Sequence, residues 1–366
     1  MERFTKYRLG DIAEMRYGKL PPDSIKSGSY PVFSGYRYVG YTDSFNCSKG
    51  TVIVVARGVG GTGDVKLTEQ DCFLTNLSIS VVLNQSICDP AYFYYKFFKN
   101  NLRYLDSGSA QSQITIDDLK RLEVTLPSLL EQQRIVRVLK SLDNKIALNN
   151  RINHNLLTIA QSLFDEKIAG RGSLEDGYNR GSLTDIAEYL NGIAMQKYPA
   201  TNSEIGLPVL KIKELGQGSC DNSSDRCSSS IPTHYVIKDG DIIFSWSGTL
   251  LVDYWCGGIC GLNQHLFKVS SNEYPGWFIY FWTKYHLERF QRIAQDKAVT
   301  MGHIRRTDLE QAEVMIPAND SMNSIDAEIS PLMEEYVKRR VENRKLQEVR
   351  DGILPQLMSG TVDLIC

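Results

Sequence analysis

The chain has 366 residues, of which 42% are hydrophobic and 23% are charged, and its formal net charge is −2 at pH 7. This composition is typical of a globular protein, and the length predicts two or more domains. The nearly neutral charge argues against a protein that binds nucleic acid by electrostatics alone, although it permits a base reader whose partners contact the phosphates. No apolar run approaches the ~18 residues of a membrane span, and the amino terminus lacks the apolar core of a signal peptide, so we expect a cytoplasmic protein without membrane contact.

Short strands, turns and a helix are predicted in the first part of the chain. Residues 51–56 and 78–83 have the apolar, β-branched pattern of strands, and residues 90–98 form an aromatic-rich helical stretch. Residues 39–41 and 60–63 carry the glycines that are typical of turns. The sequence therefore favours a mixed α and β domain here, with a curved or barrel-like sheet.

A glycine-rich loop in this part of the chain matches the GxGxxG pattern of dinucleotide-binding proteins, from Gly58 to Gly63. A dinucleotide site needs a helix directly after this loop, so that the helix amino terminus meets the pyrophosphate. Residues 64–68 instead have the pattern of a strand. We therefore expect no nucleotide site in the loop.

Residues 128–169 form the longest run without glycine or proline, and they predict a long helix. Ser128 and Glu131 have the spacing of a capping box at its start. A helix of ~40 residues is roughly 60 Å long and needs a partner along its length. Asn149 and Asn153 interrupt its apolar seam, where a polar residue can fix the register of a helix pair.

The sequence contains an internal repeat. The motif LGDIAE at residues 9–14 recurs as LTDIAE at 183–188, and four further matches follow in the same order. These are residues 50–54 with 240–244, 90–98 with 275–282, 118–119 with 308–309, and 126–127 with 316–317. Strands are predicted at 241–245 and 265–269 in the second copy. A duplicated globular unit explains this order better than chance.

A second long helix is predicted after the second unit. Ser330 followed by Pro331 predicts its start, it runs to about Met358, and Pro355 should kink or end it. Asn343 lies near its middle and is a third candidate for fixing the register. The two long helices most simply pack against each other in antiparallel orientation.

The predicted fold is therefore α+β: two globular α/β domains separated by a long antiparallel two-helix coiled coil, with an internal pseudo-two-fold repeat. The predicted boundaries are 1–127 for the first globular domain, 128–169 for the central helix, 170–317 for the second globular domain, with 170–181 as its linker, and 318–366 for the carboxy-terminal helix and tail.

Three loops in each unit differ between the copies while the segments around them persist. This pattern is typical of variable recognition loops on a constant scaffold, although an ordinary solvated loop remains an alternative for any single residue. Arginine is well suited to such a loop, because its guanidinium matches O6 and N7 of guanine. The candidate residues of the first unit are Tyr36, Arg37, Arg57, Gly58, Ser109, Gln111 and Gln113. Those of the second unit are Lys211, Lys213, Trp246, Ser247, Thr300, His303 and Arg305.

Residues for hydrolytic or transfer chemistry are not grouped in the sequence. The five histidines are scattered, without the carboxylate or cysteine spacing of a triad or a metal site. Cys256 and Cys260 lie close together, but no second pair completes four ligands, so we expect reduced cysteines and no metal. The sequence therefore predicts a non-catalytic protein.

The long-helix motifs carry a specific resemblance. Leu126-Pro127 is followed by Glu131-Gln132 and Ile135, and further motifs are GDIIFS at 240–245, LNQHLF at 262–267 and ILPQLMSG at 353–360. With these motifs and its duplicated layout, the chain resembles the DNA-specificity subunits of type I restriction-modification enzymes over essentially its full length. The second unit departs from the pattern, because residues 318–323 lack the Glu-Gln signature and leave the start of the second helix undefined.

The resemblance implies two target-recognition domains, each reading one half of a bipartite site on double-stranded DNA, and helices that set the spacer. It also implies docking of two methyltransferase (modification) subunits, which bind S-adenosylmethionine and methylate adenine, and recruitment of a restriction subunit. S-adenosylmethionine, magnesium and ATP are then expected on the partner subunits, and no cofactor on this chain. The alternative is a coiled-coil scaffold for protein interactions without DNA recognition, which gives no reason for the divergence of the loops.

Overall fold

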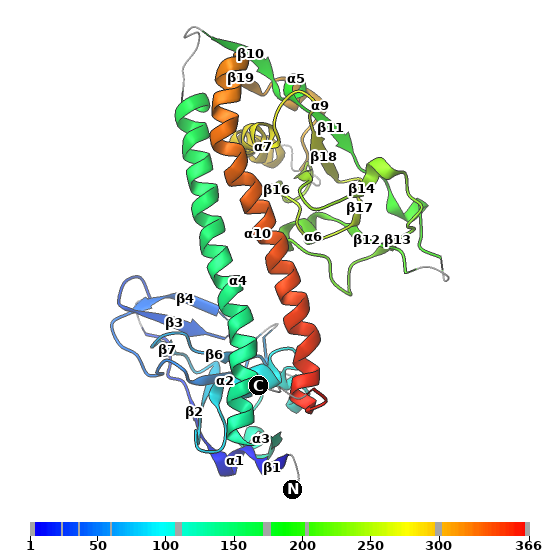
Figure 1. Ribbon diagram of the computed structural model, residues 1–366. Helices are drawn as coiled ribbons and strands as arrows, with labels where there is room; N and C mark the ends of the chain where they lie inside the picture. The colour runs from blue at the N-terminus through cyan, green and yellow to red at the C-terminus, as the bar shows by residue number, and fades with distance from the viewer. Residues whose placement is uncertain are drawn as a thin grey trace. The chain divides into compact units, whose positions relative to one another are not determined.

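The computed structural model describes residues 4–22, 25–35, 37–58, 61–106, 112–170, 177–201, 205–296 and 302–362. The chain divides into two compact units, Met1–Asp143 with Val349–Cys366, and Asn144–Glu348. The first unit contains one globular domain, and the second contains the other. The long helices α4 (Leu129–Phe164) and α10 (Asn319–Ser359) contribute to both units (Figure 1). The predicted α+β fold with two globular domains and two long helices is confirmed.

Two sheets and a ribbon make up the β structure of the first unit. A four-stranded antiparallel sheet has the order β2-β8-β5-β6 (Ala13–Tyr17, Ser78–Leu83, Val52–Val55, Val65–Leu67). A three-stranded sheet has the order β4-β3-β7 (Arg37–Thr42, Tyr30–Ser34, Phe73–Leu74), in which β3 and β7 are parallel. Strand β1 (Thr5–Arg8) pairs with β9 (Glu123–Leu126). The strands predicted at 51–56 and 78–83 are thus confirmed as β5 and β8.

Short helices complete the first unit: α1 (Leu9–Ile12), α2 (Pro90–Phe97), the 3₁₀ helix η1 (Leu102–Leu105) and α3 (Ile116–Arg121). The aromatic stretch predicted as a helix is α2, whose amino terminus is capped by Asp89 through hydrogen bonds from the backbone N–H groups of Ala91 and Tyr92. Tyr92 and Phe93 are fully buried against the four-stranded sheet, so the aromatic face supplies much of this core.

The turn predicted at residues 39–41 is wrong, because these residues lie inside β4 and pair with β3. In the sequence, Gly40 has the character of a turn residue. Its position has a different reason: a Cβ atom there would lie 2.3 Å from the backbone oxygen of Ile25. A glycine inside a strand often marks such a close approach of another backbone segment.

The second unit repeats this architecture. A four-stranded antiparallel sheet has the order β11-β18-β15-β16 (Glu188–Asn191, Leu266–Ser270, Ile242–Ser245, Val252–Tyr254). A second sheet has the order β13-β12-β17-β14 (Arg226–Cys227, Leu207–Leu210, Cys260–Leu262, Val236–Ile237), in which β12 and β17 are parallel. Strand β10 (Tyr178–Ser182) pairs with β19 (Glu313–Pro317). The strand order and the parallel pair match the first unit, which confirms the internal repeat.

Between β10 and β19, the helical segments of the second unit are α5 (Leu183–Ile186), η3 (Met195–Lys197), α6 (Ile212–Gln217), η4 (Thr233–Tyr235), α7 (Gly276–Tyr285), α8 (Leu287–Asp296) and α9 (Arg306–Glu310). Helix α7 is the second aromatic stretch, and Trp277 and Phe278 are among its buried residues. The end of the stretch expected as a linker, Tyr178 to Gly181, lies in β10, because it pairs with Val314 to Pro317 of β19.

Helix α4 begins as the capping pattern predicts, since Ser128 Oγ accepts a hydrogen bond from the backbone N–H of Glu131 at 3.3 Å. Gln132, one residue further on, is fully buried. Its Oε1 accepts from the backbone N–H of Asp89 at 2.9 Å, and its Nε2 donates to the backbone oxygens of Ile87 and Pro127, both at 2.9 Å. This one amide therefore anchors the first turn of α4 to the loop before α2.

The start predicted at Ser330 for the second long helix is wrong, whereas the predicted boundary at residue 318 lies next to its observed start. Helix α10 begins at Asn319 and continues through both Pro331 and Pro355 to Ser359. A proline inside a helix removes one hydrogen bond and costs about 3 kcal/mol. Burial of apolar residues on both sides of Pro331 offsets this cost. The buried residues are Met322, Ile325, Ile329 and Met333.

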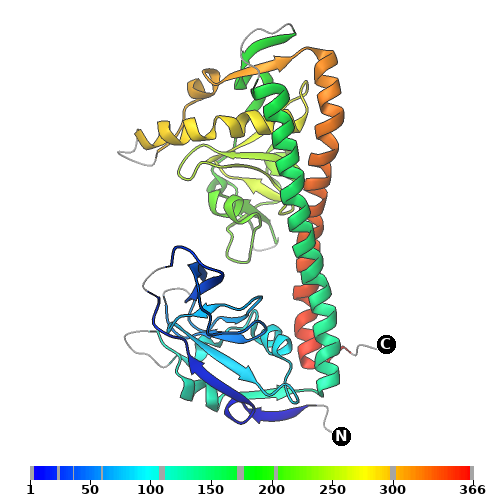
Figure 2. The ribbon, with the colours of Figure 1, turned by 90° about the vertical axis from the view of Figure 1, so that its left-hand side faces the viewer.

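The two long helices lie side by side in each unit, as the green and the orange-to-red ribbons show from two directions (Figure 1; Figure 2). In the second unit Asn149 of α4 contacts Asn343 of α10, and Lys167, in the π-helical turn η2 (Asp165–Ala169) that continues α4, pairs with Glu328 of α10. In the first unit Arg350 Nη1 lies 2.7 Å from Asp143 Oδ1. Because later residues of α4 meet earlier residues of α10, the helices are antiparallel, as predicted.

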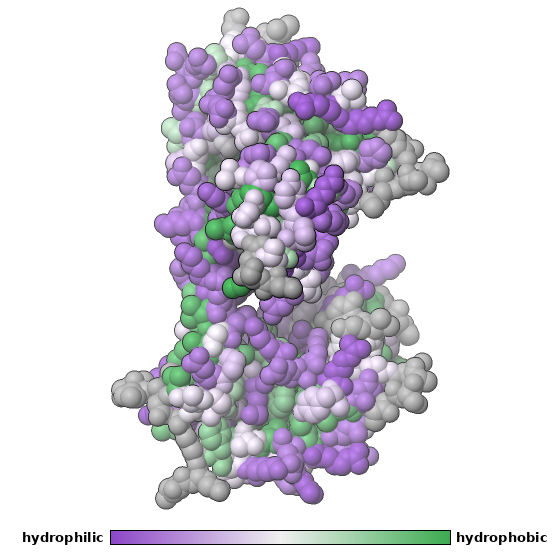
Figure 3. Space-filling model, turned by 90° about the vertical axis from the view of Figure 1, so that its right-hand side faces the viewer, coloured by the Kyte–Doolittle hydropathy of each residue, from purple (hydrophilic) through white to green (hydrophobic). Residues whose placement is uncertain are grey.

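Hydrophilic and intermediate side chains cover most of the face drawn in Figure 3, and hydrophobic side chains gather there in small scattered groups. Among the described residues, no helix combines the length and the apolar character that crossing a membrane requires. The apolar side chains are instead concentrated in the two domain cores and along the helix pair.

Candidate nucleic-acid interface

In the first unit, the loop that follows β5 carries Arg57. Its backbone N–H donates to Leu77 O at 3.1 Å, and it forms an isolated antiparallel bridge with Gln113. The side chain of Arg57 is exposed, with its guanidinium carbon 6.0 Å from the centroid of the Tyr17 ring. Gly58 follows at φ +134°, a left-handed conformation that favours glycine. The structure thus brings together three predicted residues: Arg57, Gly58 and Gln113.

Two hydrogen bonds fix the segment that carries Gln113. Its backbone N–H donates to Asp106 Oδ1 at 2.9 Å, and the N–H of Ile114 donates to Ala56 O at 2.9 Å. The turn between β3 and β4 lies beside the same loop, since a Cβ atom at Gly35 would lie 4.0 Å from Arg57 O. Arg37 is exposed at the start of β4, opposite Ser34. The predicted residues Tyr36, Ser109 and Gln111 lie outside the described residues.

In the second unit, the loop after β15 carries Trp246 and Ser247. Ser247 forms an isolated antiparallel bridge with His303, and Ile304 N–H donates to Trp246 O at 3.1 Å. The Trp246 ring lies 6.2 Å from the His303 ring, in an edge-to-face arrangement. Its Nε1 donates to Asn191 Oδ1 at 2.9 Å. Trp246, Ser247 and His303 are therefore brought together, whereas Thr300 lies outside the described residues.

The Arg57–Gln113 and Ser247–His303 bridges occupy equivalent positions in the repeat. In each unit, the segment that precedes α3 or α9 is held against the loop that follows the central strand β5 or β15. The side chains at these positions have different chemistry, an arginine and an amide in one unit and a serine and an imidazole in the other. A constant backbone arrangement thus presents different hydrogen-bonding groups.

Ser247 is only 4% exposed, which distinguishes it from its neighbours. Its Oγ lies 3.1 Å from His265 Nδ1. His265, half-buried, also faces the Trp246 ring at 6.0 Å. The hydroxyl of Ser247 is therefore placed to orient His265. The sequence alone did not single out His265, because no spaced partner accompanies it.

The two predicted lysines lie at the start of α6. Lys211 is the residue before the helix and pairs with Asp225, and Lys213 Nζ donates to Ser223 Oγ at 3.0 Å. A Cβ atom at Gly248 would lie 3.4 Å from Ile212 Cδ1, so the start of α6 is beside the loop that carries Trp246. Arg305, exposed, precedes α9, and its backbone N–H donates to Asp308 Oδ2 at 2.7 Å. Both lysine ammonium groups thus interact with nearby polar side chains, Lys211 in an ion pair and Lys213 in a hydrogen bond.

A family model described as the type I restriction modification DNA specificity domain matches residues 1–158. The chain is also similar to the type I restriction enzyme HindI specificity subunit of Haemophilus influenzae, with 44% identity over 329 residues that cover 68% of this chain and 71% of that protein. The chain belongs to the family of type I restriction enzyme specificity subunits.

Another specificity subunit, more distantly related to this chain, aligns with almost its whole length. The type I restriction enzyme MjaIX specificity subunit of Methanocaldococcus jannaschii is 24% identical over 404 residues, covering 96% of this chain and 92% of that protein. The crystal structure of a type I restriction-modification S subunit from M. genitalium superposes with a TM-score of 0.68 at 17% identity, covering 97% of this chain and 96% of that one. The fold is therefore the one found in this family.

The three asparagines predicted to fix the register of the specificity subunit's helices have different surroundings in the second unit. Asn149 is fully buried and Asn343 is 7% exposed, and they are hydrogen-bonded to each other. Asn149 Oδ1 accepts from Arg339 Nη1 at 3.0 Å, and Asn343 Nδ2 donates to Asn150 Oδ1 at 2.7 Å. Asn153 is also buried, but neither its Oδ1 nor its Nδ2 has a hydrogen-bond partner among the described residues.

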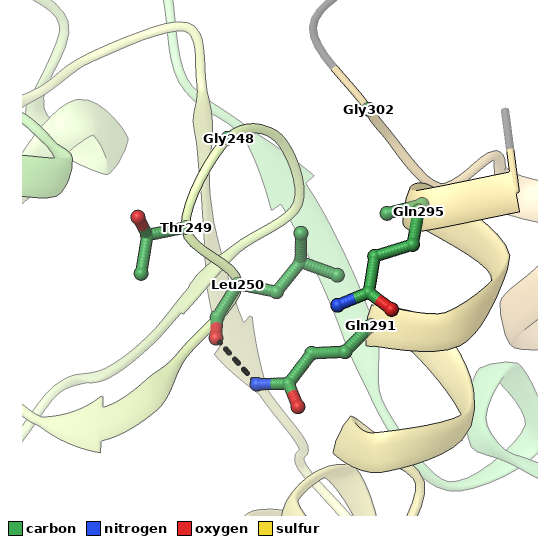
Figure 4. A pocket seen from close by; sticks show the side chains of 7 residues that line it. Gly248, Thr249, Leu250, Gln291, Gln295 and Gly302 are labelled. Carbon is green, nitrogen blue, oxygen red and sulfur yellow. Dashed lines mark hydrogen bonds between the residues drawn. The ribbon is translucent and has the colours of Figure 1, made fainter. Parts of the chain in front are cut away.

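Sequence reasoning missed helix α8 of the specificity subunit's second unit. It lies against the loop between β15 and β16, and a cavity of about 350 Å³ opens between them (Figure 4). Gly248 and Thr249 line the cavity on the loop side, and Gln291 and Gln295 line it on the helix side. Residues 287–296 carry no turn or strand signal, so their amphipathic spacing was the signal that could have revealed the helix.

Proposed function

We propose that this specificity subunit directs a type I restriction-modification complex to a bipartite sequence on double-stranded DNA, with each globular domain reading one half. The equivalent bridges Arg57–Gln113 and Ser247–His303 carry this proposal. They hold loops of different chemistry on a duplicated scaffold, as expected for two readers of different half-sites. Direct reading of bases requires such polar side chains in a groove of the duplex.

In the first domain, Arg57 is the leading candidate for a base contact, because its guanidinium can donate two hydrogen bonds to guanine. Gln113, bridged to it, can pair with adenine by donating to N7 and accepting from N6, and Arg37 is a candidate for a base or a phosphate contact. Gly58 allows the tight loop, and Tyr36, Ser109 and Gln111 are proposed as further contacts of this domain.

In the second domain, Trp246 and His303 form the proposed centre of the reader, and Ser247 supports it through His265. Lys211 and Lys213 lie at the start of α6, which is beside the loop of Trp246, and Arg305 follows His303 in the chain. These cationic residues suit phosphate contacts, which position a reader without carrying sequence information. Thr300 is proposed as a further contact. The near-neutral charge of the chain fits a protein that makes few phosphate contacts of its own, because partner subunits can neutralise much of the DNA backbone.

The long helices are proposed to set the distance between the half-sites and to dock two methyltransferase subunits. The Asn149–Asn343 pair supports this role, because polar groups that satisfy each other across a helix seam favour one register. S-adenosylmethionine would bind to the methyltransferase subunits, and magnesium and ATP would likewise bind to partner subunits and not to this chain. This chain would contribute specificity and no catalytic group.

The decisive experiment is to co-express the chain with its modification subunits and to map methylated adenines across the genome. A single split motif is the expected result, and a stable complex without methylation would contradict the proposal. A scaffold without DNA recognition predicts that outcome instead. Arg57→Ala should then alter one half of the motif, and a change in both halves would contradict the assignment of one domain to one half-site.

A further inference from the structure

Helix α8 and the loop between β15 and β16 form two walls of one cavity. Gln291 Nε2 on the helix donates a hydrogen bond to the backbone oxygen of Leu250 on the loop at 3.2 Å, which ties the walls together (Figure 4). Phe290 and Ala294 on the same helix are buried in the core of the second unit, so the rotation of α8 is fixed. Gln291 and Gln295 therefore face the loop.

The lining of this cavity is uncharged: the apolar side chains of Leu250 and Ala294 lie beside the amides of Gln291 and Gln295 and the hydroxyl of Thr249. Gln295 and Thr249 are exposed, and the Gln295 amide has no hydrogen-bond partner among the described residues. The charged residues Glu288 and Arg292 lie on another side of α8, where they line a different cavity together with Gln311. A surface that combines amide and hydroxyl groups with apolar side chains and carries no charge suits the edge of a base better than a phosphate.

The first unit has a different segment in the equivalent place. After its aromatic helix α2 comes the 3₁₀ helix η1, and Leu102 N–H donates to Gly63 O on the loop after β5 at 2.8 Å. Both units therefore bind the segment after the aromatic helix to the loop after the central strand. In the first unit this segment exposes Arg103 and Tyr104, and in the second it presents two glutamines. The backbone arrangement is the same in both units while the exposed side chains differ, as in the proposed reading loops.

We propose that α8 is a further reading element of the second domain and that Gln295 contacts a base edge, preferring an A·T pair. A glutamine amide can donate to N7 and accept from N6 of adenine, which gives this preference its chemical basis. Gln291 acts as a positioning residue, because its amide holds the loop that carries Gly248 and Thr249. This inference rests on the proposed function of the chain in DNA recognition.

The test uses the full complex of this chain with its modification subunits, co-expressed as Gln295→Ala, as Gln295→Glu and as the control Gln311→Ala. Gln311 is an exposed glutamine of the same unit that lies outside the proposed cavity. Genome-wide methylation and binding of synthetic duplexes with each base pair at the affected position are measured. Gln295→Ala should reduce the preference for A·T at one position of one half-site by about 5- to 150-fold. Gln295→Glu should shift it toward C·G, because a carboxylate accepts from N4 of cytosine.

The outcomes separate this inference from the proposed function. A split motif that stays unchanged in both Gln295 variants overturns the role of α8 and leaves the function of the chain intact. If Gln311→Ala relaxes the motif as Gln295→Ala does, the role of α8 is also overturned, because the effect would then not depend on the cavity. If the unaltered complex methylates no split motif, the proposed function fails, and this inference fails with it.

Discussion

Asn149 Nδ2 donates a hydrogen bond to Asn343 Oδ1 at 2.9 Å, in the buried contact between α4 and α10 of the second unit. Arg339 and Asn150 complete the network on either side. Each group is satisfied only while these residues stand opposite each other. A shift of one helix along the other would leave buried polar atoms without partners, which costs about 1–3 kcal/mol for each group. The pair therefore selects one alignment of the helices.

Replacing Asn149 with alanine should destabilise the helix pair of the second unit. The change leaves Arg339 and Asn343 each without one partner, and we expect a loss of about 1–3 kcal/mol in the free energy of unfolding. Urea unfolding followed by circular dichroism measures this change. Asn155→Ala is the matched control, because Asn155 is exposed on the same helix and should have little effect. Equal effects of the two substitutions would contradict the role of the network.

Asn153→Leu should have the opposite effect and stabilise the protein by about 1–2 kcal/mol. Both polar atoms of Asn153 are buried without a partner among the described residues, and an apolar side chain of similar volume removes that desolvation penalty. The same urea assay measures the gain, with Asn149→Leu as a comparison that should destabilise. A loss of stability in Asn153→Leu would mean that this amide makes a bond that the structure does not contain.

Stability of the second unit should fall as the pH drops below about 6.5 because of His286. Burial, together with the charge of Arg289, holds the pKa of His286 below its ordinary value of 6.5, although the hydrogen bond to Glu313 O raises it. The unfolded chain then takes up a proton at a higher pH than the folded one. The contribution of neutral His286 to the free energy of unfolding is fully present above about pH 6.5, and it is lost as the pH falls toward the pKa of His286 in the folded protein.

The measurement for His286 is the thermal midpoint of the wild type and of His286→Gln between pH 7.5 and 5.5. Glutamine keeps a donor for Glu313 O but does not titrate in this range. The wild type should lose stability relative to the variant as the pH falls. A constant difference between the two proteins across the range would show that His286 does not contribute to the pH dependence.

Cys220 should be the first of the described cysteines to react with an alkylating reagent. It is half-buried, whereas the other six are buried. The hydrogen bond with the Cys260 thiol lowers the pKa of Cys220, although burial raises it. Burial raises the pKa of Cys88 to about 12 and that of Cys256 to about 11, so these thiols rarely ionise at neutral pH.

Timed iodoacetamide labelling followed by mass spectrometry gives the order of reaction. Cys47 provides an internal comparison, because the hydrogen bond with Cys72 lowers its pKa while burial shields it. Cys220→Ser should remove the fast phase that belongs to the described cysteines. Faster labelling of Cys47 than of Cys220 would contradict the expected order of reaction.

The sequence predicted the duplicated domains and the central strands because the repeat and the apolar runs are local signals. Residues 78–83 are one example, since their pattern alone defines β8. The start of α10 could not be predicted in this way, because Met322 and Ile329 stabilise its first turns through contacts with distant parts of the second unit. Tertiary packing there overrides the local signal of Pro331.

The candidate site was predicted less completely than the fold. Arg57 and Gln113 lie far apart in sequence; matching the two copies of the repeat made both loops candidates, and only the structure shows that the two residues are bridged. Asn149 and Asn153 have equivalent seam positions in the sequence, and only the structure distinguishes the bonded amide from the unbonded one. Gln295 was missed, because nothing local indicates that α8 faces the loop after β15.

The anchor of each long helix also limits how related chains can be recombined. In the first unit the amide of Gln132 holds α4 to the loop before the aromatic helix. In the second unit Trp277 Nε1 of the aromatic helix donates to Asp326 Oδ1 of α10 at 2.7 Å. A different hydrogen bond therefore anchors the long helix to the domain there. A chimaera joined at residue 127 would separate Gln132 from its own domain. Crossovers that preserve folding should therefore fall inside the helices, beyond the anchoring turn.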